Sequence, residues 1–465
     1  MLKTIWNNII AGANKISPLI NRFAIPVIII VASAARIWMY GDPNLSIAGN
    51  DTLSYVESSQ VPLFSKEIMM GRRMLTTNLL YKLFEPEDGY KILVNGSIET
   101  TRRLIQPGFN NIVIFQLLMS LAGWGSLAYM VAKYIKNPAM KILAAITVTV
   151  FGFTPQIADW DSILMSESLT YSLFALQLAF LIYFVFSIYD NPEFNSIFFF
   201  TLWAVVYFFW TFARDSNLYV SLITIALVGV LIFSTRYRKN KLIYKILALL
   251  IAIFILGFYT SSNSTRSLLT FINIYDGDLL RSPARIETLT KLGMPEPRTE
   301  AYRVWFEDHA VTTLVKFMFI HPGYPATKLI RDFPQAFTEI KQTYFHVPVK
   351  DPARPILMGL GDLFHPEHAS ASLLGLFLFI GAITAAKKNP HGFNLPWAWI
   401  GSWLFLTASS TLVLVILGDT WGLNRHALLS TMIFRLFMWI FTLIIIDMAI
   451  EQNTTAAPRL STTSQ

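Results

Sequence analysis

Long apolar runs alternate with short polar loops along most of the chain. Ten of these runs have the length and composition that predict membrane-spanning helices. They lie at about 21–40, 109–135, 140–153, 169–188, 196–212, 218–233, 242–259, 371–386, 397–417 and 428–450. The pattern therefore predicts an all-α polytopic membrane protein with about ten transmembrane helices.

Two long polar segments interrupt this pattern. Residues 41–108 join the first two spans, and residues 260–370 join the seventh and eighth. The second segment has helix-like stretches separated by Pro and Gly, which predicts a small helical insertion that caps the bundle. The chain thus divides into a transmembrane module (1–259), this insertion and C-terminal helices (371–450). The Thr-, Ser- and Ala-rich tail 451–465 has the composition of a disordered segment.

The distribution of Lys and Arg among the short loops predicts the orientation. Thirteen of them lie in or beside the loops on one side of the predicted spans, whereas the short loops on the other side hold only Arg214 and Arg425. Because short cytoplasmic loops are enriched in Lys and Arg, we expect both termini in the cytoplasm and both long polar segments outside. The net charge of +8 could indicate a nucleic-acid partner, but the basic residues cluster in the short loops, where they act as orientation signals. Nucleic acid is therefore not an expected partner.

The composition agrees with this class of protein. Charged residues make up 14% of the chain, against roughly 25% in soluble domains. The chain has no cysteine, which excludes disulfides and thiolate metal sites. It also has no glycine-rich nucleotide-binding fingerprint.

Three acidic residues near the outer ends of spans are candidates for chemistry, because carboxylates near lipid are costly. Asp51 can accept a proton from an incoming hydroxyl or cap a helix that starts at Thr52. Glu167 opens a strongly apolar run, where an acid also stabilises a helix N-terminus. For Asp161 and its neighbour Asp159, the helix-terminal role is the favoured interpretation. Their shared side predicts one polar cavity at the outer face.

Basic residues on the same side are candidates for binding an anion. The stretch MMGRRMLTTNLLYKLF predicts an amphipathic interfacial helix in the first outer loop, with Arg72 and Arg73 in one sector. Guanidinium groups suit a phosphate, although an interfacial helix also binds lipid headgroups without specificity. Arg425 and His426 have no acidic sequence neighbour, so a ligand or one of the outer acids must neutralise the arginine. Arg214 has a potential local partner in the next residue, Asp215.

Two further groups are interpreted as structural. Arg36 and Arg435 lie within predicted spans, where an ion pair is at least as good an explanation as a ligand. The HPEH segment at 365–368 contains a proline, which favours a loop over a helical metal site.

Taken in order, these elements resemble a known family. The first span contains Ala35–Arg36, and a D-x-x-x-Y element follows at Asp51–Tyr55. The GRR…LLYKLF segment, the sequence LMSESL and a late Arg-His pair come next. The order resembles the GT-C superfamily of integral-membrane glycosyltransferases, in the style of bacterial enzymes related to protein O-mannosyltransferases and aminoarabinose transferases. The resemblance covers mainly residues 25–220.

The resemblance implies sugar transfer from a polyprenyl-phosphate donor to a glycan, lipid or protein acceptor. The reaction would occur at the outer face of a prokaryotic plasma (inner) membrane. It implies that Asp51 and Glu167 are catalytic, with Asp51 as the base in a one-step, inverting displacement. The donor phosphate would be held by Arg72, Arg73, Arg425 and His426, and Tyr55, Asp161 and Arg214 are the expected substrate-binding residues. Some relatives carry a second acid beside the first-loop Asp; here Asn50 takes that place, so a divalent metal is not supported.

Other classes of function remain open at this point. A lipid-linked glycan ligase or polymerase would use a similar outer site and would move a chain rather than one sugar. A transporter or flippase predicts polar groups near the membrane midplane and often repeated halves, whereas here the polar groups gather at one face. In a structural or sensory membrane protein the acids would be incidental.

Overall fold

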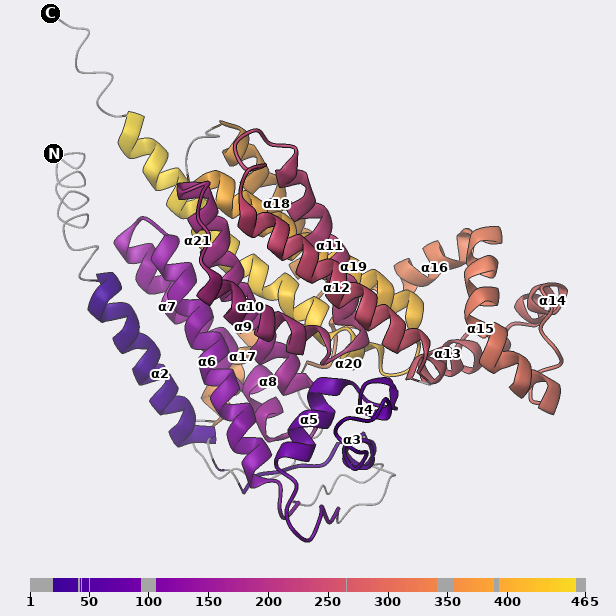
Figure 1. Cartoon of the computed structure of the whole chain (residues 1–465). Coiled ribbons are helices and arrows are strands. Elements are labelled where there is room, and N and C mark those ends of the chain that lie inside the picture. Colours follow the sequence, from indigo (N-terminus) through magenta and orange to yellow (C-terminus); the bar gives the residue numbers. More distant parts are fainter. Residues whose placement is uncertain are drawn as a thin grey trace, which may run out of the picture.

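Helices dominate the part of the chain that the computed structural model describes, residues 20–40, 42, 44–49, 51–92, 106–264, 266–340, 354–388 and 393–456. Within these residues the protein is an all-α polytopic membrane protein, as predicted (Figure 1). Residues 451–456 of the predicted disordered tail instead continue the last helix, which ends at Ala456, and the rest of the tail lies outside the described residues, as does Asn50.

Among the described residues, eight helices are long and apolar enough to cross a membrane, and each coincides with a predicted span. They are α2 (Ile25–Tyr40), α6 (Asn110–Tyr134), α9 (Glu167–Asp190), α11 (Asp215–Ile232), α12 (Lys241–Ser262), α18 (Ser370–Lys388), α19 (Asn394–Gly418) and α21 (Leu428–Ala456).

The other two predicted spans are irregular. In the third, α7 (Pro138–Phe153) is followed, across a 49° bend, by α8 (Pro155–Ala158) and the 3₁₀ turn η2 (Asp159–Ser162). Proline disfavours helical geometry in the residue before it, and the residue before Pro155 is extended, with ψ 155°. The fifth is α10 (Ile197–Thr211), whose 15 residues are fewer than the roughly 20 that span a bilayer.

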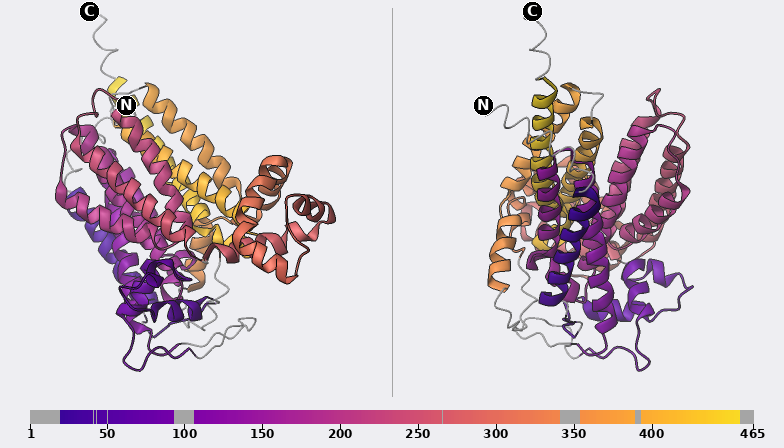
Figure 2. Two further views of the ribbon diagram at one scale, coloured as in Figure 1. Left: turned by 45° about the vertical axis from the view of Figure 1, so that its right-hand side comes forward. Right: turned by 90° about the vertical axis from the view of Figure 1, so that its left-hand side faces the viewer.

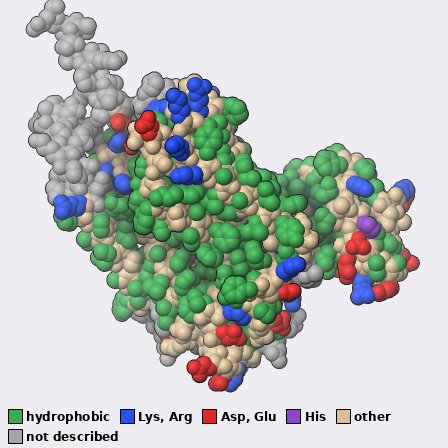
Figure 3. Space-filling view, viewed as in Figure 1, with side chains coloured by type: hydrophobic (Ala, Val, Ile, Leu, Met, Phe, Trp, Pro, Cys, Tyr) green, Lys and Arg blue, Asp and Glu red, His purple; other side chains and the backbone are tan. Residues whose placement is uncertain are grey.

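The two ends of the bundle differ in character. The start of α2 and the end of α21 lie at one end, shown at the top of Figure 1, where Lys and Arg side chains gather (Figure 3). The short helices lie at the opposite end; they are α3 (Thr52–Ser59), α4 (Glu67–Met70), α5 (Leu75–Leu83) and α20 (Leu423–His426). Hydrophobic side chains cover the flank between the two ends.

Small residues allow close packing at the centre of the bundle, as is usual for membrane helices. α6 packs along both α7 and α9. A Cβ at Gly123 would lie 2.3 Å from the carbonyl oxygen of Ser172, and one at Gly152 would lie 2.3 Å from the ring of Trp124. The first contact fixes α9, whose first residue is Glu167, against α6, and the second fixes α7 against α6.

The insertion forms α13 (Arg266–Gly277), α14 (Pro283–Lys291), α15 (Glu300–Ile320), α16 (Gly323–Asp332) and α17 (Arg354–Phe364). α14 and α15 project beside the bundle rather than over it, unlike the expected cap (Figures 1 and 2). This lobe has its own small hydrophobic core, which includes Tyr275, Trp305 and Phe306. α17 returns to the bundle, where it packs against α8.

Candidate functional site

The first outer loop is tied to the turn that precedes α9. The backbone N–H of Ile47 donates to the Ser162 carbonyl (2.8 Å), and the Ile47 carbonyl accepts from the N–H of Leu164 (2.9 Å). The loop then passes so close to Met165 that a Cβ at Gly49 would lie 1.9 Å from its sulfur. Only a residue without a side chain fits there without a shift of Met165.

Hydrogen bonds from the first turn of α3 complete this attachment. The Thr52 hydroxyl donates to the Leu164 carbonyl (2.8 Å) and accepts from the N–H of Gly49 (2.7 Å). The Tyr55 hydroxyl donates to the hydroxyl of Ser166 (3.1 Å). The N-terminus of α3 is thereby held beside the N-terminus of α9, which brings Asp51 and Glu167 into one region.

Asp51 is held by two arginines from distant parts of the chain. Nη2 of Arg73 donates to Oδ1 (2.8 Å), and Nη2 of Arg425 donates to Oδ2 (2.6 Å). Asp51 occupies the N-cap position of α3, but its side chain makes no capping hydrogen bond. The capping interpretation is therefore wrong for the side chain, which is committed to the arginines.

These contacts set the protonation of Asp51. Burial favours the neutral acid, but the charges and hydrogen bonds of Arg425 and Arg73 outweigh burial and hold the pKa of Asp51 well below its usual range. Asp51 is consequently ionised at neutral pH. In this paired state it is a weak base, since an effective general base has a pKa near the working pH.

Arg73 is itself positioned by α3. Its Nε donates to the hydroxyl of Ser54 (2.7 Å), and its guanidinium lies 4.4 Å from the centre of the Tyr55 ring. Tyr55 is 5% exposed. It was expected to bind substrate, but the structure gives it a supporting position beneath Arg73.

Glu167 lies between the guanidinium groups of Arg214 and Arg425. Its Oε1 is 3.6 Å from Nη2 of Arg214 and 3.6 Å from Nε of Arg425. The Glu167 side chain is 1% exposed. Its Oε2 and Nη1 of Arg214 are buried without a hydrogen-bond partner among the described residues, so both retain capacity to bind a ligand.

His426 and Asp419 support Arg425. The Asp419 carboxylate pairs with Nδ1 of His426, and Nη2 of Arg425 lies 3.3 Å from Nε2 of the same ring. Because a guanidinium only donates, the contact with Arg425 is a hydrogen bond when Nε2 accepts and the ring proton lies on Nδ1, facing Asp419. Asp419 also accepts the N–H groups of Thr420 (2.6 Å) and Trp421 (3.0 Å).

Arg72 does not join the cluster, contrary to prediction. Its side chain is 55% exposed, and its contact is a 4.0 Å ion pair with Glu57. The predicted continuous helix is broken between α4, which ends at Met70, and α5, which begins at Leu75. Arg72 and Arg73 lie in that break, where adjacent side chains do not share a helical face.

Asp161 also lies outside the cluster. Its carboxylate accepts from Nη2 of Arg36 (2.9 Å) and from the hydroxyl of Ser168 (2.7 Å), and the pair is almost fully buried. This geometry supports the ion-pair interpretation of Arg36, and a substrate-binding role of Asp161 stays a prediction. Asp159, in the same turn, pairs with Arg354 of α17.

Two other expected pairings differ in the structure. Arg214 contacts Glu167, while its sequence neighbour Asp215 pairs with Arg266 (3.4 Å). The buried Arg435, for which an ion pair was expected, donates instead to the carbonyls of Pro366 and Phe337 (3.0 Å each).

Sequence reasoning missed Asp419, although the criterion that selected Asp51 applies to it. Asp419 follows the apolar helix α19 on the same side of the bundle, seven residues before His426. Among the described residues, no group of three or more His, Asp or Glu side chains is arranged to hold a metal ion.

Comparisons with known proteins give a distant structural match. No family model and no curated protein matches the chain. A solved structure of the archaeal oligosaccharyltransferase AglB from Archaeoglobus fulgidus, in complex with an inhibitory peptide and a dolichol-phosphate, matches with a TM-score of 0.46 and 9% identity. The match covers 96% of this chain and 53% of that one, so the chain spans about half the length of its neighbour.

Proposed function

We propose that the protein is a membrane glycosyltransferase that moves a sugar from a polyprenyl-phosphate donor to an acceptor. One observation carries the proposal: Arg73, Asp51, Arg425, Glu167 and Arg214 alternate in charge within one partly buried cluster. Within these five residues three guanidinium groups face two carboxylates, and the third carboxylate nearby, Asp419, is engaged by His426 and by the N–H groups of Thr420 and Trp421 rather than by a guanidinium group. A phosphate ester on a lipid carrier has the complementary charge and the acceptor oxygens that guanidinium groups bind best.

The location of the cluster suits a lipid-linked donor. It lies at the end of the bundle that holds α3, α5 and α20, below the hydrophobic flank (Figures 1 and 3). The connection between α3 and α4 exposes Leu63 (44%) and Phe64 (98%), as a segment that dips into the membrane interface does. A lipid-borne phosphate can reach the arginines there while its chain stays in the bilayer.

The orientation follows from the basic loops at the opposite end. Because Lys and Arg favour the cytoplasmic side, we infer that both termini are cytoplasmic and that the cluster lies at the outer face. The resemblance to bacterial GT-C enzymes adds a prokaryotic plasma membrane to the proposal. A donor presented there needs no nucleotide-binding loop.

The ion pairs suggest the order of events. The donor phosphate competes with Asp51 for Arg73 and Arg425, since both anions use the same guanidinium groups. Once the phosphate engages them, Asp51 loses its closest positive charges and its pKa rises. The donor thus converts a paired carboxylate into a usable base, so it binds before the acceptor.

The reaction is then a single displacement. The acceptor hydroxyl oxygen forms a bond to the anomeric carbon, and Asp51 takes its proton. The bond from that carbon to the phosphate oxygen breaks, and its electron pair leaves with the polyprenyl phosphate, whose charge the arginines stabilise. Attack opposite the leaving group inverts the anomeric configuration. Glu167 keeps Arg214 and Arg425 in place.

A transporter is less consistent with the site. Transporters bind their substrates near the membrane midplane, whereas this cluster lies at one end of the bundle. A glycan ligase or polymerase would use the same chemistry on a longer donor, and the product distinguishes it.

The test is a donor screen. Purified full-length protein in lipid nanodiscs is incubated with radiolabelled polyprenyl-phosphate monosaccharides, and with lipid-linked oligosaccharides as a separate arm. Consumption of one donor with release of polyprenyl phosphate is the expected result. Consumption of an oligosaccharide alone indicates the ligase or polymerase, and no consumption of any donor contradicts glycosyl transfer.

A further inference from the structure

The insertion contains a pocket distinct from the arginine cluster. It lies between α14, α15 and α16 and has a volume of about 460 Å³. Small-molecule sites fall in roughly the same range, 300 to 1,000 Å³. Its lining holds Arg285, Lys328, Arg331 and His321 but no carboxylate, so a ligand in the pocket meets mainly positive groups.

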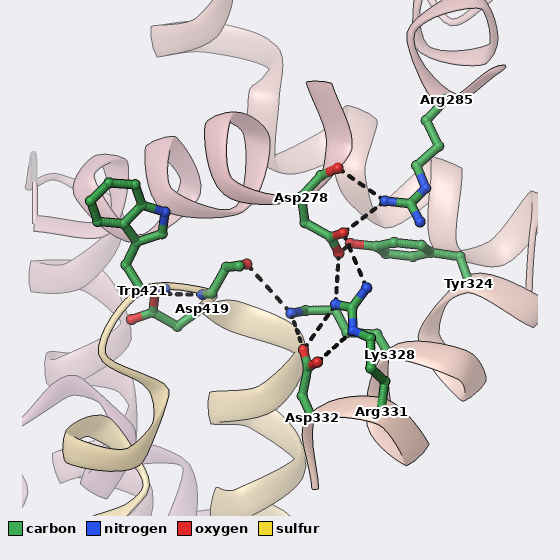
Figure 4. A network of polar contacts seen from close by, with 9 residues as sticks. Asp278, Arg285, Tyr324, Lys328, Arg331, Asp332, Asp419 and Trp421 are labelled. Carbon is green, nitrogen blue, oxygen red and sulfur yellow. Dashed lines mark hydrogen bonds and ion pairs between the residues drawn. The ribbon is translucent and has the colours of Figure 1, made fainter. Parts of the chain in front are cut away.

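The carboxylates that partly neutralise these cations belong to residues outside the lining. Asp278 accepts from Nη1 of Arg285 (2.7 Å), the Tyr324 hydroxyl (2.9 Å) and Nη2 of Arg331 (3.3 Å) (Figure 4). Burial opposes ionisation of Asp278, but its hydrogen bonds from Arg331, Tyr324 and Arg285 prevail and lower its pKa. Asp278 therefore holds the basic side chains in place as a fixed anion.

The charges in this network do not cancel. Asp332 accepts from Nζ of Lys328 (2.8 Å) and from Nε of Arg331 (2.6 Å). Asp278 and Asp332 carry two negative charges, whereas Arg285, Lys328 and Arg331 carry three positive ones. One positive charge is left for a ligand. The Arg285 and Arg331 side chains are 31% and 48% exposed, so solutes can reach them.

The other walls suit a sugar ring. Phe317 and Tyr324 line the pocket with ring centres 5.2 Å apart, and they provide apolar surface. Thr288 and Thr327 add hydroxyl groups to the lining. A few polar groups on a partly aromatic wall are the usual means of orienting a small ligand.

The lobe is anchored on the turn that supports the arginine cluster. Nζ of Lys328 donates to the Thr420 hydroxyl (3.4 Å), and the Asn273 amide donates to Asp419 (3.3 Å). A Cβ at Gly277 would lie 2.7 Å from the indole nitrogen of Trp421. Figure 4 shows Asp419 and Trp421 beside this network. Asp419 in turn pairs with His426, so the pocket and the cluster share one support.

We propose that this pocket binds the acceptor, and that it recognises a sugar unit bearing one anionic group, such as a carboxylate or a phosphate. The identification of the ligand as an acceptor rests on the proposed glycosyl transfer. The chemistry of binding follows from the pocket alone. The pocket would hold the anionic unit while another part of the acceptor reaches Asp51.

Binding is tested by calorimetry on full-length protein in neutral-lipid nanodiscs, with glucuronate as the probe and glucose as its uncharged counterpart. Loss of one charged hydrogen-bonding group typically weakens binding about tenfold. We expect glucuronate to bind at least tenfold more tightly than glucose, and Arg285→Gln to remove about that factor. Equal affinity for the two sugars, or no binding of glucuronate, overturns the proposal.

Control variants separate the pocket from the fold. Arg303→Gln removes an arginine of the same lobe that pairs with Glu300 outside the pocket, and it should leave binding unchanged. Thr327→Met provides an independent test in case Arg285→Gln unfolds the lobe. It fills the pocket without touching the ion pairs, and it should abolish binding. Nanodiscs with phosphatidylglycerol test for a lipid headgroup site: unchanged glucuronate affinity supports the proposal, and complete competition overturns it.

The same variants distinguish the two proposals. Arg285→Gln should leave donor binding intact and raise the KM for an anionic acceptor. A wild-type protein that binds glucuronate but consumes no donor refutes the proposed function and leaves the anion site in place. A protein that consumes donor but binds no anionic sugar refutes only the proposed role of the pocket.

Discussion

Arg425 and Asp51 are 374 positions apart in the sequence, and yet they form a 2.6 Å ion pair. The pair joins α20, near the end of the chain, to the first outer loop. Arg425 also contacts Glu167 at the start of α9. The same guanidinium group therefore connects the proposed base, Asp51, to the positioning residue Glu167. It is also the group most directly placed to exchange an internal carboxylate for a donor phosphate.

Arg72 and Arg73 provide a matched pair for testing phosphate binding. Arg73→Gln should weaken donor affinity roughly tenfold or more, because a charged hydrogen bond contributes about 1.5–3 kcal/mol. Arg72→Gln should leave affinity unchanged, since that side chain is turned to solvent. Equilibrium binding of a radiolabelled donor measures both. Equal losses in the two variants would indicate general attraction to anionic lipid instead.

The buried pair of Arg36 and Asp161 should be structural. Removing one partner leaves a buried charge uncompensated, which typically costs 3–5 kcal/mol. Arg36→Met should therefore lower the Tm markedly, and the double variant Arg36→Met/Asp161→Leu should recover most of the loss. Transfer activity of the recovered double variant should be close to that of the wild type. A folded double variant without activity would restore the substrate-binding role of Asp161.

The pH dependence of turnover should change with donor occupancy. In the free protein the arginines lower the pKa of Asp51, so ionisation persists to acidic pH. In the donor complex the phosphate removes that effect and the pKa is higher. The acid limb of kcat, which reports the complex, should thus lie at higher pH than the acid limb of kcat/KM for the donor, which reports the free enzyme. Coincident limbs would argue against the exchange of ion pairs.

The depressed pKa of Asp51 also has a consequence for stability. Its ion pairs stabilise the folded state at pH values above the unfolded pKa, about 3.9. That contribution is lost as the pH falls towards the lower folded-state pKa. Acid unfolding of Asp51→Asn should accordingly be less steep than that of the wild type below about pH 4.

The membrane helices were largely predictable, because twenty-residue apolar runs admit few alternatives. The break at Pro155 and the short α10 were less so, since hydrophobicity alone does not reveal a bend. Asp51 and Glu167 were predictable as candidates from their place beside apolar runs, and Arg73, together with Arg72, from the predicted interfacial helix. Their partners were not: Arg425 reaches Asp51 only through tertiary packing, and Arg214 prefers Glu167 to its own neighbour Asp215. Arg72 was assigned to the same face as Arg73 because a continuous helix was predicted; both residues lie in the break between α4 and α5, and Arg73 contacts Asp51 whereas Arg72 is exposed.

The central claim is that Asp51 accepts the acceptor proton once the donor has displaced its arginines. The most direct measurement compares donor binding and sugar transfer for Asp51→Asn and Asp88→Asn, the latter being the same change at an exposed aspartate of the first loop. Asp51→Asn should reduce transfer by about 10²- to 10⁴-fold while binding donor as tightly as the wild type or more tightly, because the competing carboxylate is gone. Asp88→Asn should match the wild type in both. Near-normal transfer by Asp51→Asn, or a loss of its donor binding, would contradict the account.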